Sequence, residues 1–241
     1  MFKLLNAEFK TLLAWKGILY VIALTLIIGI FCPGINILNE SPTLDGCFTF
    51  PFVVLAILST FLGLFTYRDY SQNTIRNKIV VGNSRASIYF AKSLLVFGTM
   101  LVLMMLFLGV NVLIGWCFGD TSYIECDVFI NNCLMILIST LVIASFTSLT
   151  SICIQSPIGA MLPLMFMMSS MFACTIMFEM FTINENKFMI ELFQTLPVVS
   201  LITLSETVQP FDLIGTTVYG LAMTLVLQLS GFAIFRKTDL K

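Results

Sequence analysis

Five stretches without a charged residue constrain this chain more than any other feature. They cover residues 17–39, 46–67, 93–119, 128–178 and 213–235. A helix that crosses the hydrocarbon layer of a bilayer needs roughly 20 mostly apolar residues, because each residue adds about 1.5 Å of length. Every stretch reaches that length, and hydrophobic residues form 59% of the chain against 10% charged. The sequence therefore predicts an all-α integral membrane protein with one transmembrane domain.

The fourth stretch is too long for one crossing. Near its middle it contains Gln155, Ser156 and Pro157. Serine followed by proline is a frequent helix start, since the hydroxyl caps the first turn and the proline needs no N–H partner there. We therefore divide the stretch into spans at 128–154 and 157–178, and the chain is expected to have six spans.

The basic residues indicate the orientation, because lysine and arginine near span ends stay on the cytoplasmic side. With both termini in the cytoplasm, every basic residue except Lys187 falls on that side. The acids fall mostly on the other side, apart from Glu8, Asp69 and Asp239. We expect a multi-pass protein of the cell membrane, in a bacterium the plasma membrane. The net charge of -1 gives no sign of nucleic-acid binding.

Residues 1–16 repeat apolar side chains every three or four positions. The apolar positions are Phe2, Leu5, Phe9 and Leu12, and Lys3, Asn6 and Lys10 lie opposite them. This pattern predicts an amphipathic helix in the cytoplasmic interface. A signal peptide is the alternative, but no small-x-small cleavage site follows. The first span is expected to end near Cys32-Pro33-Gly34.

The segment 68–92 is the only internal one that is dense in basic residues. It reads RDYSQNTIRNKIVVGNSRASIYFAK. Ser71 or Thr74 can cap a helix, and Gly82-Asn83 suits a left-handed stop. We expect a short helix at 71–81, in which Ile75 and Ile79 form an apolar pair, and a second start at Ser84 that continues into the third span.

The segment 182–212 is nearly apolar but is interrupted by Glu191 and Pro197. A seventh crossing here would place Arg236 and Lys237 outside. We instead expect two re-entrant helices that dip into the outer leaflet, with their backbone covered by protein.

Several kinds of chemistry are excluded by residues that are missing. The chain has no histidine and no Gly-Lys dipeptide, so histidine-based catalysis and a Walker A phosphate loop are both absent. The cysteines show no CxxC spacing and are expected to be packing residues, although Cys32–Cys47 and Cys117–Cys126 bonds are conceivable. We expect no metal site, no cofactor bound by this chain and no enzymatic activity of its own.

The spans also lack the charged residues that ion-coupled transporters keep at membrane depth. An active transporter of this kind would therefore need a separate ATPase. The segment 68–92 resembles the connector of ABC-2 type transporter permeases, which shows an acid-x-x-x-G/N-T-x-R-x-K pattern followed by a Ser-Arg pair. The matching residues are Asp69, Asn73, Thr74, Arg76, Lys78, Ser84, Arg85 and Lys92.

The resemblance implies a dimer, here a homodimer, in which each copy rests on a cytoplasmic ABC ATPase subunit that binds ATP and Mg. It makes the helix at 71–81 the coupling helix, with Ile75 and Ile79 packed under the spans. The residues that would contact the ATPase are Asn73, Thr74, Arg76, Asn77 and Lys78. The alternative is that these basic residues face lipid headgroups, as topology alone demands.

The substrate path is less defined in the sequence. Flexible thioethers suit a surface that adapts to apolar partners, so we expect the methionine-rich fifth span to line the substrate path. Four residues of this span are the candidates. They are Met161, Met165, Met168 and Phe172. The alternative for these four residues is ordinary packing between helices. In the fourth span, Ser145, Ser148 and Ser151 recur at helical spacing, and they are suited to hydrogen bonds between helices.

The sequence thus predicts the permease subunit of an ATP-driven exporter. Charge-free spans favour an amphipathic or hydrophobic cargo, such as a bacteriocin, a toxin or a drug. A non-transporting immunity or assembly protein that binds a partner in the bilayer would explain the charge-free spans equally well. An ion-coupled carrier is the third possibility.

Overall fold

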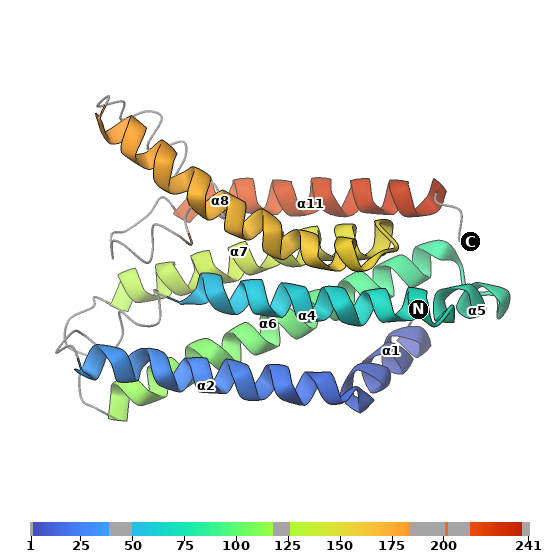
Figure 1. Ribbon diagram of the computed structural model, residues 1–241, viewed down its shortest axis with the longest axis horizontal. Coiled ribbons are helices and arrows are strands. Elements are labelled where there is room, and N and C mark those ends of the chain that lie inside the picture. The colour runs from blue at the N-terminus through green and yellow to red at the C-terminus, as the bar shows by residue number, and fades with distance from the viewer. Residues whose placement is uncertain (1, 39–49, 118–125, 184–200, 202–212, 238–241) are drawn as a thin grey trace.

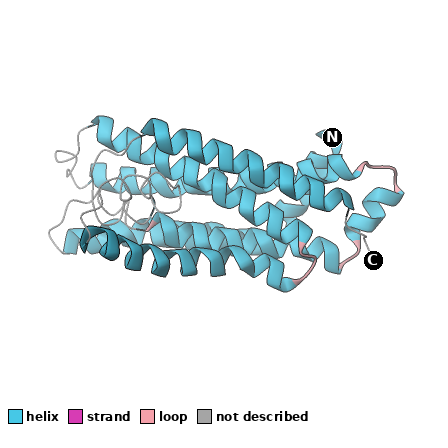
Figure 2. Cartoon of the chain, turned by 90° about the horizontal axis from the view of Figure 1, so that it is seen from above, coloured by secondary structure: helices cyan, strands magenta, loops and turns pink. Residues whose placement is uncertain are grey.

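The computed structural model describes residues 2–38, 50–117, 126–183, 201 and 213–237. In these ranges all regular secondary structure is helical (Figure 2), so the predicted all-α class is confirmed. The helices are α1 (Phe2–Ala14), α2 (Lys16–Leu38), α4 (Pro51–Ser71), α5 (Thr74–Val80), α6 (Arg85–Cys117), α7 (Cys126–Cys153), α8 (Pro157–Ile183) and α11 (Leu213–Lys237). The re-entrant helices expected at 182–212 lie almost wholly outside the described residues.

The long helices run along the longest axis of the molecule in alternating directions (Figure 1). Helix α7 packs against α4, α6, α8 and α11 and so forms the centre of the bundle, while α2 packs against α6 and α4. Close approach is possible where residues are small: a Cβ at Gly63 of α4 would lie 2.6 Å from the Ala160 carbonyl oxygen of α8. Small residues allow this closeness in membrane bundles.

Four helices are long and apolar enough to cross a membrane, namely Pro51–Ser71, Arg85–Cys117, Phe129–Cys153 and Ile214–Lys237. Helices α1 and α2 meet at a bend of 70° and pass the same test together, which raises the number to five. In α8 the apolar helix Pro157–Ala173 is shorter. The described residues therefore show several membrane-capable helices, and the number of six spans stays a prediction.

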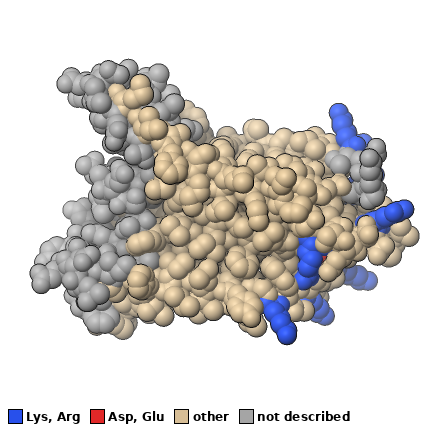
Figure 3. Space-filling view, viewed as in Figure 1, with Lys and Arg blue, Asp and Glu red and all other residues tan. Residues whose placement is uncertain are grey.

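Helix α1, helix α5 and the C-terminal end of α11 all lie at one end of the bundle (Figure 1), which we call the basic end. Figure 3 shows the lysine and arginine side chains gathered there on the face in view. The described basic residues are Lys3, Lys10, Lys16, Arg68, Arg76, Lys78, Arg85, Lys92, Arg236 and Lys237. The fold thus brings together the three basic segments that the sequence separates.

Two helix starts follow the caps that the sequence predicts. The Ser87 N–H donates to Ser84 Oγ at 3.2 Å before α6, and the Gly159 N–H donates to Ser156 Oγ at 3.4 Å before α8. The expected end at Pro33 is wrong, because α2 continues to Leu38 with this proline inside. An apolar helix in a bundle tolerates proline when its neighbours and local adjustments compensate for the lost hydrogen bond.

The buried face of α1 differs from the expected apolar stripe. Leu12 is buried as expected, but Phe9 is 51% exposed and the charged Glu8 is only 2% exposed. Glu8 and Leu12 are one turn apart, so they share a face. A carboxylate therefore points into the bundle, and its partners lie at the candidate site described next.

Candidate functional site at the basic end

The segment 68–92 forms a helix, a turn and a second helix, but α5 begins later than expected. Ser71 does not cap it: this residue ends α4, where its Oγ donates to the Arg68 carbonyl oxygen at 2.8 Å. The cap position is held by Asn73, whose φ of 55° is left-handed and which makes no side-chain cap bond. Asparagine tolerates this conformation better than most residues. Helix α5 therefore starts at Thr74.

The end of α5 is where the sequence predicts it. Gly82 has a φ of 96°, which glycine adopts without a steric penalty. The Gly82 N–H donates to Ile79 at 2.9 Å and the Asn83 N–H donates to Lys78 at 3.2 Å, both to carbonyl oxygens. This pair of bonds is a Schellman stop. Helix α5 is thus a single short unit of seven residues.

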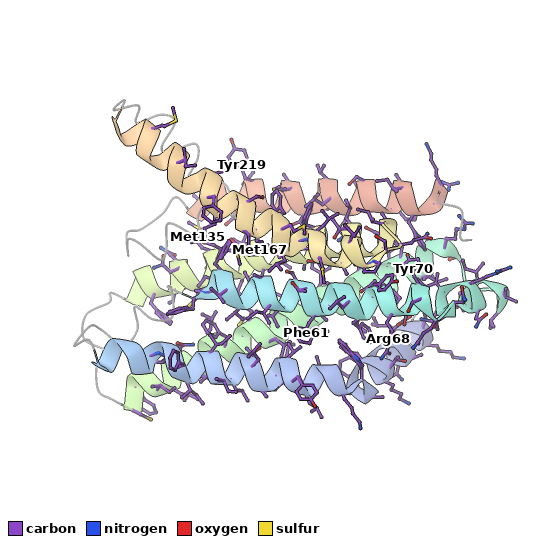
Figure 4. The ribbon with its side chains drawn as sticks, in the orientation of Figure 1. Phe61, Arg68, Tyr70, Met135, Met167 and Tyr219 are labelled. Carbon is purple, nitrogen blue, oxygen red and sulfur yellow. The ribbon has the colours of Figure 1, made fainter. Side chains whose placement is uncertain are left out.

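Ile75 holds α5 against the bundle. Its side chain is 1% exposed and packs in a cluster with Ile88, Tyr89, Ile152 and Phe235. Ile79 is partly buried against the same cluster, as the apolar pair predicted. The Tyr70 hydroxyl, labelled in Figure 4, donates to the Ile152 carbonyl oxygen at 2.6 Å and ties the end of α4 to α7.

Four charged side chains join α5 to three other helices. They are Glu8 of α1, Asp69 of α4, Lys78 of α5 and Lys92 of α6, and we call them the ion cluster. Lys78 pairs with Glu8 and lies 3.1 Å from Asp69 Oδ2. Lys92 pairs with Asp69 and lies 3.4 Å from Glu8 Oε2. Each carboxylate contacts both ammonium groups, so the charges balance.

The ion cluster is almost closed to solvent. The side chains of Glu8, Asp69 and Lys92 are 2–3% exposed, and that of Lys78 is 19% exposed. A buried charge is costly unless it is paired and hydrogen-bonded. Burial alone would lower the pKa of Lys78, but the hydrogen bond to Glu8 and the negative charge of Asp69 outweigh it and raise that pKa. Lys78 therefore stays charged at neutral pH.

Arg68 lies beside the ion cluster and is held by aromatic rings. Its guanidinium carbon is 5.3 Å from the ring centre of Phe65 and 5.7 Å from that of Trp15, within the range of cation–π contacts. Trp15 occupies the bend between α1 and α2. The contact thus connects this bend to the end of α4, where Figure 4 labels Arg68.

The residues expected to contact an ATPase lie on different sides of α5. Asn73, Arg76 and Asn77 are exposed and Thr74 is half-buried, whereas Lys78 directs its ammonium group inward to the ion cluster. Sequence reasoning missed the apolar tip that follows: Val80 and Val81 are 80% and 81% exposed. The signal for this tip in the sequence was a pair of adjacent valines within a basic segment.

A polar cavity of about 160 Å³ opens between the end of α4, helix α5 and the turn between α7 and α8. Its polar lining residues include Asn73, Arg76, Asp69 and Gln155. The Gln155 Nε2 is closed to solvent and has no hydrogen-bond partner among the residues that the structure describes.

The expected path residues share one face of α8. The exposed fractions are 43% for Met161, 59% for Met165, 42% for Met168 and 70% for Phe172. By contrast Met167, which points to the interior in Figure 4, is 1% exposed. The rest of the chain covers these four side chains only in part, so they form a thioether-rich, partly exposed face of α8.

A second polar network joins three helices deeper in the bundle. Gln228 of α11 donates from Nε2 to Ser148 Oγ at 2.8 Å, and its Oε1 accepts from Ser93 at 3.0 Å and from the Tyr89 hydroxyl at 3.2 Å. Ser145 and Ser151 bond to carbonyl oxygens of their own helix. Of the three serines, Ser148 is the one for which the described residues show a hydrogen bond between helices.

The described cysteines form no disulfide. Cys117, Cys133 and Cys153 are free thiols, so the conceivable Cys117–Cys126 bond is not formed, and Cys32–Cys47 falls outside the described side chains. Among the residues that the structure describes, no three His, Cys, Asp or Glu side chains come together as a metal site.

Comparison with protein-family models, with curated proteins and with solved structures finds no match. The resemblance of segment 68–92 to ABC-2 type permeases therefore stays a prediction. The features of the chain that bear on its function are α5, the ion cluster and the polar cavity beside them.

Proposed function

We propose that this chain is the membrane-spanning permease subunit of an ATP-driven ABC exporter. In this proposal the chain crosses a bacterial plasma membrane six times with both termini in the cytoplasm, and the basic end is cytoplasmic. A separate ATPase subunit binds ATP and Mg and docks on α5. The chain itself is not an enzyme, and it works as a homodimer.

The observation that carries the proposal is the construction of α5. It is a short helix with a defined start and stop, held to the bundle by Ile75 on one side and exposing Asn73, Arg76 and Asn77 on the other. A docking element needs these two sides, one bound to the moving helices and one free for the partner. The exposed tip at Val80 and Val81 adds an apolar contact.

The ion cluster supports the proposal because it links α5 to more than one helix. Through Lys78, the position of α5 affects Glu8 on α1 and Asp69 on α4, and both carboxylates also contact Lys92 on α6. A movement of α5 driven by ATP would therefore reach α1, α4 and α6 together. Topology alone requires basic residues at this end but not such a pairing.

The exposed face of α8 supports a role in contacts with cargo or with a second copy. Its thioethers and Phe172 suit varied apolar partners, since methionine side chains adapt their shape. With spans that carry no charged residue, the favoured cargo is amphipathic or hydrophobic: a peptide such as a bacteriocin or toxin, or a drug. Helix α1, bent by 70° from α2, suits the cytoplasmic interface.

The test is the ATPase activity that copurifies with the tagged chain from its native membranes. The double variant Arg76→Glu with Val81→Asp alters exposed side chains only, so it should insert and fold normally yet lose most of the copurified ATP hydrolysis. Lys237→Glu, an exposed charge change on α11, is the matched control and should keep it.

Three results would contradict the proposal. The first is a wild-type protein that copurifies with no ATP hydrolysis, which would favour the non-transporting immunity or assembly protein. The second is full activity in the double variant, which would move the docking site away from α5. Export that stops when the proton gradient collapses, despite ample ATP, would instead favour an ion-coupled carrier.

A further inference from the structure

A second cavity, larger and of a different character, lies between α1, the start of α2, and α6. Its volume is about 440 Å³, within the range of roughly 300–1,000 Å³ that is usual for ligand pockets. Phe9 and Leu13 of α1, Ile22 of α2, and Leu94, Gly98 and Val102 of α6 line it. We call it the α1–α6 groove.

The α1–α6 groove is open and apolar. Phe9, Leu13, Leu94 and Val102 are each at least half exposed. Apart from its own stretch of helix, a Cβ built on Gly98 would meet none of the described residues within 4 Å, so this glycine leaves open space in the lining of the groove. Of its polar lining residues, Thr99 already donates its hydroxyl to the Leu95 carbonyl oxygen. The groove therefore suits a hydrocarbon chain.

The exposed charged residues that adjoin the groove-lining residues of α1 and α2 in the sequence are basic. Lys10 follows Phe9 in α1 and Lys16 begins α2, and both side chains are exposed. Glu8 is the only acid among residues 2–38, and it is buried in the ion cluster with two lysines. An apolar slot with a positive rim complements a molecule that has an apolar chain and an anionic head.

We propose that the α1–α6 groove binds an anionic phospholipid from the leaflet at the basic end. One acyl chain lies in the groove over Gly98, and the phosphate faces Lys10 and Lys16. This goes beyond the permease assignment and depends only on the chain lying in a membrane. A second copy is a poorer occupant, because a two-fold contact would place the same positive rim against itself.

The experiment uses the full-length protein in vesicles of dioleoylphosphatidylcholine with a trace of phosphatidylglycerol that carries a diazirine in its acyl chain. After photolysis, mass spectrometry locates the labelled peptides. The label should concentrate on residues 5–13 and 94–103, and unlabelled phosphatidylglycerol should compete at least tenfold better than phosphatidylcholine.

Two pairs of variants give the test its controls. Gly98→Leu fills the groove and should lower the labelling at least fivefold, while Gly109→Leu is the matched control, since a Cβ at Gly109 also meets nothing within 4 Å and lies outside the groove. Lys10→Gln should lower the preference for phosphatidylglycerol by about fivefold, the effect of one basic residue near an anionic surface. Lys237→Gln should not.

Three results would overturn the proposal. Equal competition by phosphatidylcholine would show ordinary boundary lipid without selectivity. Unchanged labelling in Gly98→Leu would place the lipid elsewhere. Efficient disulfide crosslinking between two copies of Gly98→Cys would show that a second copy covers the groove.

Discussion

The ion cluster leads to the sharpest prediction about stability. Replacing Glu8 by Gln keeps the shape of the side chain but leaves Lys78 and Lys92 with Asp69 as their only carboxylate. Lys92 is 3% exposed and cannot turn to solvent without moving α6. The variant therefore contains one uncompensated buried positive charge.

The cost follows from that burial. Removing one partner of a buried ion pair typically costs about 3–5 kcal/mol. Glu8→Gln and Lys92→Gln should both fall in this range, whereas Lys78→Gln should cost less because Lys78 is 19% exposed and water already screens it. The double variant Glu8→Gln with Lys92→Gln restores neutrality and leaves the Lys78–Asp69 pair at 3.1 Å. Its cost should be lower than the sum of the two single costs by about 0.5–3 kcal/mol.

The assay is equilibrium unfolding of the purified protein in mixed micelles, followed by tryptophan fluorescence. Trp15 is a suitable reporter because it packs beside Arg68 near the ion cluster. Lys3→Gln, an exposed change on the same helix, is the control and should stay within about 0.5 kcal/mol of wild type. The reasoning is refuted if Glu8→Gln is as stable as this control, or if the two single costs simply add.

Two further predictions concern α11, and thermal unfolding in detergent checks both. A Cβ at Gly231 would lie 2.3 Å from the Tyr89 hydroxyl oxygen, so Gly231→Ala should destabilise the protein by about 1–3 kcal/mol. Adding Tyr89→Phe to this variant removes the colliding oxygen and should recover part of the lost stability. Gln228→Leu removes hydrogen bonds to α6 and α7 and should cost about 1–2 kcal/mol, since such bonds average roughly 0.6 kcal/mol in membrane bundles. A melting temperature unchanged in Gly231→Ala, or raised in Gln228→Leu, would contradict the packing described here.

Local signals in the sequence were enough for three helix boundaries. Ser84, Pro157 and Gly82 act within one turn of the backbone, and each marks a boundary in the structure where the sequence predicts it. Ser71 failed as a start signal because the hydroxyl bonds within α4 instead. A residue that can cap a helix does not end the helix before it when the next turn is still favourable. Here the contacts of Tyr70 with α7 and of Asp69 with Lys92 keep α4 helical beyond the charge-free stretch 46–67.

The ion cluster could not be predicted in the same way, because its members are far apart in the chain. Glu8 and Lys92 are separated by 84 positions, and no periodicity connects them. The sequence contains one electrostatic signal for the ion cluster, namely that Glu8 and Asp69 are two of the few acids placed on the lysine-rich side. Which lysine pairs with which acid depends on how α1, α4 and α6 pack, and that is decided by apolar contacts distributed over the whole bundle.

The position of α5 depends on these long-range contacts rather than on its own sequence. A helix of seven residues is too short to be stable alone, because nucleation is costly and few backbone bonds follow it. Ile75 and Lys78 therefore hold it in place, one by apolar burial and one by charge. Burial of Ile75 tolerates small displacements, but the ion pairs weaken steeply with distance in a site closed to water. A force on the exposed side of α5 would thus act first on Lys78, and through the two shared carboxylates on Lys92 and α6.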